Sequence, residues 1–191
     1  MACTRSAMML LNAHSYDPDL LGALYRNVPC VFGTHQLLYI GASPKPNGTK
    51  FLRELLDSGA YVSILEQSKP NVEYVKKAAV SVPRIQRVYC GSPHTWLPPS
   101  SKLYSATFWW YGAEQLPKHQ LALAVANIEH YTTAIVVIGC PFGVQAPTQN
   151  WYTHTLTGGY IPADFHRLGY HTETIGQKNQ PGGHITAWKH L

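Results

Sequence analysis

Charged residues are scarce in this chain of 191 residues. Asp, Glu, Lys and Arg together make up 13% of it, and Asp and Glu number only ten. Hydrophobic residues make up 45%, which is typical of a globular protein and not of a disordered one. The formal net charge of +5 comes partly from the shortage of acids, without a dense run of Lys and Arg. Nucleic acid therefore stays open as a partner but is not favoured.

Closely spaced cysteines are also missing. The four cysteines, Cys3, Cys30, Cys90 and Cys140, are far apart in the sequence, whereas zinc sites and thioredoxin-like redox motifs need close pairs. The ten histidines supply no HxxxH pair. We therefore expect reduced, mostly buried thiols and no metal site.

Long apolar runs are absent as well. No stretch approaches the ~20 apolar residues that cross a bilayer, and the short apolar patch Ala7–Leu11 lacks the features of a secretory signal. We therefore expect a soluble, cytoplasmic protein with no membrane partner. Because the length suits one domain and no repeat or linker is present, we expect a single domain over 1–191, with 1–33 as a helical cover.

Short apolar runs alternate with segments of helical periodicity. The expected strands are Leu37–Ser43, Tyr61–Gln67, Arg84–Cys90, an aromatic strand from Ser105 to about Gly112, Ala134–Pro141, Tyr170–Ile175 and His184–Lys189. The expected helices are Thr49–Ser58, one that starts at Pro70, Lys118–Tyr131 and Pro162–Leu168. This alternation predicts an α/β fold with a mostly parallel sheet and helices on both faces, closed by a C-terminal antiparallel hairpin.

The carboxyl ends of parallel strands are where such sheets bind ligands. Gly41, Ala42 and Ser43 make a small turn after the first expected strand, and Glu66 ends the second strand 25 residues after Gly41. Small residues let a nucleoside approach the backbone, and an acid at about this spacing accepts ribose hydroxyls. The alternative is that Gly41 only begins a loop and that Glu66 is a solvated strand end.

Two common nucleotide motifs are absent from this turn. The next glycine after Gly41 is Gly48, so the G-x-G-x-x-G pattern of nicotinamide-dependent oxidoreductases is not present. The order Gly48-Thr49-Lys50 also inverts the Lys-then-hydroxyl order of a P-loop. The sequence therefore favours neither a nicotinamide-dependent oxidoreductase nor a P-loop protein.

Several segments resemble a known family. The order of elements from about Leu37 to Leu191 looks like the class I S-adenosylmethionine-dependent methyltransferases, and bacterial members have segments similar to FWWYGAEQLPKHQ, VVIGCPFG, DFHRLGYHTETIG and HITAWK. The resemblance implies a three-layer Rossmann-like sandwich with a seven-stranded sheet and S-adenosylmethionine as cofactor. The residues expected to bind it are Gly41, Ala42, Ser43, Glu66, Gln67, Cys90, Gly91, Ser92, Trp109 and Trp110.

The resemblance also assigns parts of the cofactor to parts of the chain. Glu66 would hold the ribose hydroxyls, Cys90–Ser92 would flank the adenine, and Trp109–Gly112 would border the methionine end. The chain differs from the family pattern in the Pro-containing turn after Gly41 and in Gln115, where the family tends to have His. These differences leave open a methyltransferase-like protein that has lost catalysis and serves in binding or regulation.

Methyl transfer depends mostly on positioning, so a strong base is optional. The candidate catalytic residues are Tyr111, Glu114 and His154, with His119 as a further candidate base. The aromatic run Phe108–Tyr111 would shield a sulfonium through ring faces, although we expect two of its four rings to serve only as core. The expected acceptor is a small molecule, because the loops Pro93–Ser101 and Gly143–Gly159 are rich in aromatic and uncharged polar residues suited to covering a pocket.

Overall fold

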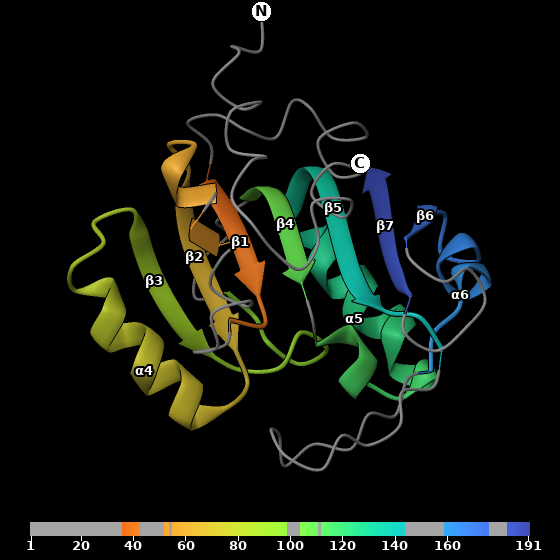
Figure 1. Ribbon diagram of the computed structural model, residues 1–191, viewed down its shortest axis with the longest axis horizontal. Coiled ribbons are helices and arrows are strands. Elements are labelled where there is room, and N and C mark those ends of the chain that lie inside the picture. Colours follow the sequence, from red (N-terminus) through yellow and green to blue (C-terminus); the bar gives the residue numbers. More distant parts are fainter. Residues whose placement is uncertain are drawn as a thin grey trace, which may run out of the picture.

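A seven-stranded sheet forms the centre of the molecule, in the order β3-β2-β1-β4-β5-β7-β6 (Figure 1). The computed structural model describes residues 36–42, 52–53, 55–98, 104–110, 112–143, 159–175 and 183–191. The expected helical cover over 1–33 lies outside these residues. β1 to β5 are parallel, and β7 runs antiparallel to both β5 and β6. The predicted mixed sheet with a C-terminal antiparallel hairpin is confirmed.

The strands lie where the apolar runs predicted them, with small shifts at their ends. Their bounds are β1 Gln36–Ile40, β2 Tyr61–Glu66, β3 Ile85–Cys90, β4 Tyr104–Trp110, β5 Thr132–Pro141, β6 His171–Ile175 and β7 His184–His190. β1 ends three residues before the predicted Ser43, because the chain turns at Gly41, where φ is +90°. Glycine adopts this left-handed region at little cost.

The described helices cover both faces of the sheet. They are α4 Lys69–Ala79, the 3₁₀ helix η2 Ala113–Gln115, α5 Lys118–His130 and α6 Pro162–His166, and residues 52, 53 and 55–57 are also helical. Pro70 lies in the first turn of α4, where a missing N–H costs nothing. Figure 1 shows α4 in front of the sheet beside β3 and α5 behind β4 and β5.

Two apolar cores lie on opposite faces of the sheet, because successive strand residues point to opposite sides. One core holds Leu38, Ile40 and Trp109 together with the buried face of α5. The other holds Tyr39 and Trp110 together with Val75 of α4. The central strands are therefore buried on both faces, which explains why their sequences are continuous apolar runs.

β1 lies at the point where the strand order reverses. Chain order places β2 and β3 on one side of β1 and β4 and β5 on its other side. In open α/β sheets this reversal opens a crevice at the carboxyl ends of the strands. The predicted reversal of strand order just beyond Ile40 is therefore confirmed. Among the described residues, no helix has the length and apolar character needed to span a membrane.

Candidate functional site

The turn after β1 brings bare backbone to the switch point. The Gly41 N–H donates to the Leu65 carbonyl at 3.1 Å, which continues the pairing of β1 with β2 beyond Ile40. Ala42 is buried in the core on the α4 face. Ser43, the third expected residue of this turn, lies outside the described residues. The described part of the turn, with its small residues, is thus held against β2.

Glu66 ends β2, the neighbour of β1, and its side chain is only 6% exposed. Its Oε1 accepts the Ser68 N–H at 2.8 Å, just before α4 begins. Burial raises the pKa of Glu66 above its ordinary value, and hydrogen bonds from the Ser68 backbone, the Asn71 side chain and the Gln67 backbone offset part of this effect. Glu66 is thus a buried carboxylate with hydrogen-bond donors around it. The alternative, that Glu66 is a solvated strand end, is wrong.

Gln67 follows Glu66 and reaches across the end of β1. Its Nε2 donates to Oε1 of Gln115 at 2.8 Å, and Gln115 belongs to η2, which follows β4. The sequence placed Gln67 in the site but gave no reason to pair it with Gln115, because the two residues are 48 positions apart. Only the strand order brings them together.

The segment after β3 is more enclosed than the sequence suggested. A Cβ on Gly91 would lie 3.0 Å from Cδ1 of Trp96, so Trp96 covers this glycine. The Ser92 hydroxyl lies 2.8 Å from Nδ1 of His94. Cys90 is exposed, because β3 forms an edge of the sheet, so the expectation of a buried thiol is wrong at this position.

Trp96 is a residue that the sequence did not single out. Its ring centroid lies 5.0 Å from that of Tyr89 and 6.2 Å from that of Tyr131. Asn127 of α5 donates to the carbonyls of Pro93 at 2.8 Å and of Trp96 at 2.7 Å. The start of the Pro-rich loop is therefore fixed to α5, although the sequence suggested a cover over a pocket.

The aromatic strand β4 ends in three buried rings. Phe108, Trp109 and Trp110 are 0%, 1% and 4% exposed. Trp109 faces the α5 core, whereas Phe108 and Trp110 face the α4 core. We expected two of the four aromatic residues to serve as core. All three that the structure describes are buried in the cores, so the expected number is too low. Tyr111 lies outside the described residues.

Two glycines make room for these tryptophans. A Cβ on Gly139 of β5 would lie 2.5 Å from Cε3 of Trp110, so the indole ring rests directly on this glycine. Gly112 has φ +136°, and a Cβ there would lie 3.1 Å from Nε1 of Trp109. The positions of both rings therefore depend on the absence of a side chain.

Glu114 is the predicted catalytic residue that the structure describes. It lies in η2 and is 8% exposed, and its Oε2 accepts the Gly112 N–H at 2.7 Å. Burial raises the pKa of Glu114, and backbone hydrogen bonds from Gly112 and Glu114 itself lower it in part. His119 is exposed at the start of α5, and His154 lies outside the described residues.

We expect Glu114→Gln to stabilise the protein at neutral pH. Because the folded-state pKa lies above the ordinary 4.5, the folded state binds more protons than the unfolded state, and stability falls as pH rises through that window. Glutamine still accepts the Gly112 N–H but carries no buried charge. We expect a gain of about 0.5–2 kcal/mol, or about 1–8 °C in Tm, at pH 7.

Thermal unfolding between pH 7 and pH 4.5 checks this result, with exposed Glu73→Gln as the control. The advantage of Glu114→Gln over the wild type should shrink as the pH falls, because Glu114 becomes protonated in the wild type. A pH-independent difference between the two proteins would contradict the assignment of a buried charge.

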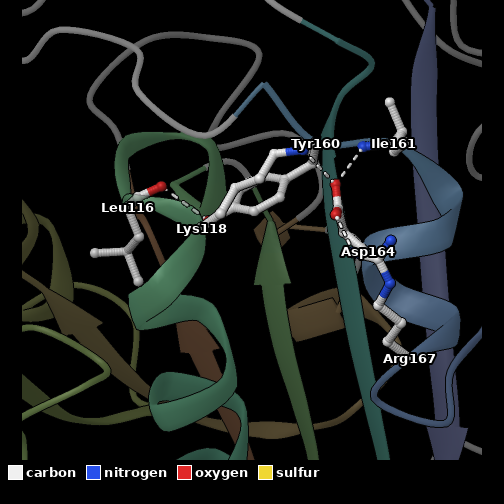
Figure 2. A network of polar contacts seen from close by, with 6 residues as sticks. All are labelled: Leu116, Lys118, Tyr160, Ile161, Asp164 and Arg167. Atoms are coloured by element: carbon white, nitrogen blue, oxygen red, sulfur yellow. Dashed lines mark hydrogen bonds and ion pairs between the residues drawn. The ribbon is translucent and has the colours of Figure 1, made fainter.

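A network of polar contacts fixes α6 to the segment that carries Glu114 (Figure 2). The Tyr160 hydroxyl donates to the Leu116 carbonyl at 2.8 Å, and Lys118 Nζ donates to Oδ2 of Asp164 at 2.8 Å. The same Oδ2 accepts the Ile161 N–H at 3.0 Å. Figure 2 shows Tyr160 reaching toward Leu116 beside the start of α5.

The charges in this network favour its ionised form. Burial alone would raise the pKa of Asp164, but Lys118, the Ile161 N–H and Arg167, whose guanidinium lies 3.5 Å away, together hold that pKa below its ordinary value. These contacts hold the residues that directly follow η2, the 3₁₀ helix that carries Glu114 and Gln115, in a fixed position.

Within the described ranges, no group of three or more His, Cys, Asp or Glu is arranged to hold a metal ion.

Comparisons with known proteins add to this geometry. No protein-family model and no curated protein matches the chain. Solved structures do match, among them DhpI in complex with SAH, with a TM-score of 0.65 and 13% identity over 91% of this chain and 85% of that one. The N-methyltransferase NodS from Bradyrhizobium japonicum WM9, in complex with S-adenosyl-L-homocysteine, matches with a TM-score of 0.61 and 12% identity over 98% and 97%.

The matches extend beyond methyltransferases. A structure from Rhodobacter sphaeroides described as a putative Zn-dependent alcohol dehydrogenase has a TM-score of 0.63 and 9% identity over 93% of this chain and 91% of that one. Similarity at such low identity establishes architecture, and architecture does not fix chemistry. The sheet order, the switch point at β1 and these matches together show that the chain has the Rossmann-like fold of the class I S-adenosylmethionine-dependent methyltransferases.

Proposed function

We propose that this protein binds S-adenosylmethionine and transfers its methyl group to a small-molecule acceptor. The observation that carries the proposal is the pairing of Gly41 with Glu66 across the switch point. Gly41 supplies backbone without a side chain at the end of β1, and Glu66 supplies a buried carboxylate at the end of the neighbouring strand. A backbone floor beside one acid suits a nucleoside with free ribose hydroxyls.

The acceptor capacity of Glu66 fits this ligand. A carboxylate offers about four lone-pair positions, and donors from Ser68, Gln67 and Asn71 do not exhaust them. Donation from ribose hydroxyls would favour the ionised form, which burial by itself disfavours. Hydrogen bonds from the ligand would therefore stabilise the negative charge of Glu66 beyond what the protein alone provides.

The chain's own contribution to the reaction is positioning. S-adenosylmethionine supplies a methyl group on a positively charged sulfur. The end of β4 would border this end of the ligand, where Tyr111 directly follows the buried Trp110. Aromatic faces attract a cation by about 0.5–2 kcal/mol per contact.

Glu114 is the group we propose for taking a proton from the acceptor. Its raised pKa brings it closer to neutral pH, where a general base works best. Its hydrogen bond to the Gly112 N–H fixes the carboxylate at the end of β4. His154 is the second proposed base, by its place in the sequence alone.

The proposed acceptor class rests on the aromatic and uncharged polar composition of the Gly143–Gly159 loop and on the matched structures. Two of them are described as magnesium protoporphyrin IX methyltransferase from Synechocystis PCC 6803 and as Burkholderia thailandensis 1,6-didemethyltoxoflavin-N1-methyltransferase. Both names state a small-molecule acceptor.

Calorimetry with S-adenosylmethionine and S-adenosylhomocysteine tests the proposal. We expect saturable binding of both at micromolar concentrations, with a similar affinity because they share the adenosyl and amino-acid parts. No heat of binding for either ligand at millimolar concentration would refute the proposed cofactor.

A methyltransferase-like binding protein without catalysis is the second candidate. The turn after Gly41 favours it, because Pro44 and Pro46 withdraw two backbone donors from the place where the family has glycines. Transfer of labelled methyl groups to a library of small-molecule extracts separates the two candidates. Binding of S-adenosylhomocysteine without any transfer supports the second.

A further inference from the structure

The hydrogen bond between Gln67 and Gln115 spans the switch point. Gln67 follows β2 and Gln115 follows β4, and β1 lies between these two strands. Neighbouring strands are about 4.8 Å apart, so the bridge crosses roughly 10 Å over the carboxyl end of β1. Both side chains are half-buried, so solvent still reaches them at the carboxyl ends of the strands.

Both ends of this bridge are fixed by their own backbones. Gln67 lies between the end of β2 and the N-terminal turn of α4, where the Ser68 N–H bonds to Glu66. The Gln115 N–H donates to the Gly112 carbonyl at 3.1 Å, and the Tyr160 hydroxyl holds the next residue, Leu116. Side-chain rotation can therefore open the bridge without moving either strand.

A ligand placed as proposed must cross the same gap. A nucleoside that contacts Glu66 and continues to Trp110 runs from the end of β2 to the end of β4, and it therefore passes the end of β1. The bridge joins those two strand ends. Ligand and bridge thus compete for the space above Gly41.

From this geometry we infer that Gln67 and Gln115 form a latch that closes the crevice and opens when an adenine nucleoside enters. The inference rests on the proposed function. Once open, Gln67 offers one amide donor and one acceptor to the ligand, the combination that pairs with the edge of adenine. Gln115 is then the residue that controls access and takes no part in holding the ligand.

The Gln67–Gln115 hydrogen bond by itself is cheap to break, because a hydrogen bond between two neutral amides stabilises a protein by only about 0.5–1.5 kcal/mol net. This corresponds to about 2- to 12-fold in an equilibrium constant. A ligand that binds only the open form has its affinity reduced by the open fraction. Removing the latch should therefore tighten binding by the same factor.

Two measurements on the full chain test the latch. Unfolding of the ligand-free wild type, Gln67→Ala, Gln115→Ala and the double variant gives the coupling between the two residues, which we expect to be about 2- to 12-fold in the unfolding equilibrium constant. Calorimetry should then show that Gln115→Ala binds S-adenosylhomocysteine about 2- to 12-fold more tightly than the wild type. Gln120→Ala, on the first turn of α5, is the matched control and should bind like the wild type.

The outcomes distinguish the latch from the proposed function. Equal or weaker binding by Gln115→Ala, or no coupling in the ligand-free protein, overturns the latch and leaves the function standing. No binding by either the wild type or Gln115→Ala refutes the proposed function and the latch with it. Coupling that stays unchanged in saturating S-adenosylhomocysteine also overturns the latch, because the ligand would then lie beneath a bridge that never opens.

Discussion

Glu66→Gln is expected to weaken the binding of S-adenosylhomocysteine by about 10- to 100-fold. Hydrogen bonds to a charged acceptor contribute about 1.5–3 kcal/mol, and glutamine keeps the shape of the side chain but loses the charge. The substitution would also place an NH₂ group where one of the two carboxylate oxygens accepts. Isothermal titration calorimetry at pH 7 measures the change directly.

The substitution separates binding from folding. The side-chain carbonyl of glutamine still accepts the Ser68 N–H, and a buried charge disappears, so the thermal stability should not fall. Glu73→Gln is the matched control, since Glu73 lies exposed on α4 in an ion pair with Lys76. If Glu66→Gln binds S-adenosylhomocysteine as tightly as the wild type, the proposed contact between Glu66 and the ribose is wrong.

We expect the same carboxylate to make binding depend on pH. Its raised pKa means that a growing share of the ligand-free protein carries a neutral Glu66 as the pH falls toward 4.5. A protonated carboxyl accepts fewer hydroxyl hydrogens, so affinity should decline at acid pH in the wild type. Glu66→Gln should lack this part of the decline.

Gly139→Ala is expected to cost about 1–3 kcal/mol of folding free energy, which lowers Tm by about 2–12 °C in a protein of this size. The added methyl group would lie 2.5 Å from Cε3 and 2.7 Å from Cζ3 of Trp110. Those atoms belong to a rigid, buried ring, so the whole indole must move. Thermal denaturation followed by circular dichroism measures the loss.

A smaller ring tests whether Trp110 causes this loss. Combining Gly139→Ala with Trp110→Phe should recover part of the stability relative to the sum of the two single changes, because phenylalanine lacks the ring that meets the new methyl group. Equal stability of Gly139→Ala and the wild type would contradict the contact. Because Trp110 ends β4, we also expect Gly139→Ala to weaken S-adenosylhomocysteine binding.

Sequence patterns predicted the elements of this fold closely, for local reasons. The continuous apolar run at Leu37–Ile40 marks a strand buried on both faces, and Gly41 marks its end because the chain turns there with positive φ. Pro70 marked the start of α4 in the same way. The largest shift, at Ser43, arose because small residues after a strand do not show where pairing stops.

The candidate site could be predicted only as a set of strand ends. Glu66 and Gly41 were predicted as neighbours because parallel strands end at the same edge of a sheet. The sequence did not show that Trp96 covers Gly91 or that Trp110 rests on Gly139, because these contacts depend on ring orientations that many residues set together.

Local residue patterns thus determined by themselves that this chain forms an α/β sheet whose strand order reverses after its first strand. Only the tertiary structure decided that Glu114 is buried and that Gln67 meets Gln115 across the carboxyl end of β1. The physical reason is distance along the chain. Periodicity and turns act over a few residues, whereas burial and bridging depend on which strands become neighbours, and here β1 brings β2 and β4 to within reach of each other.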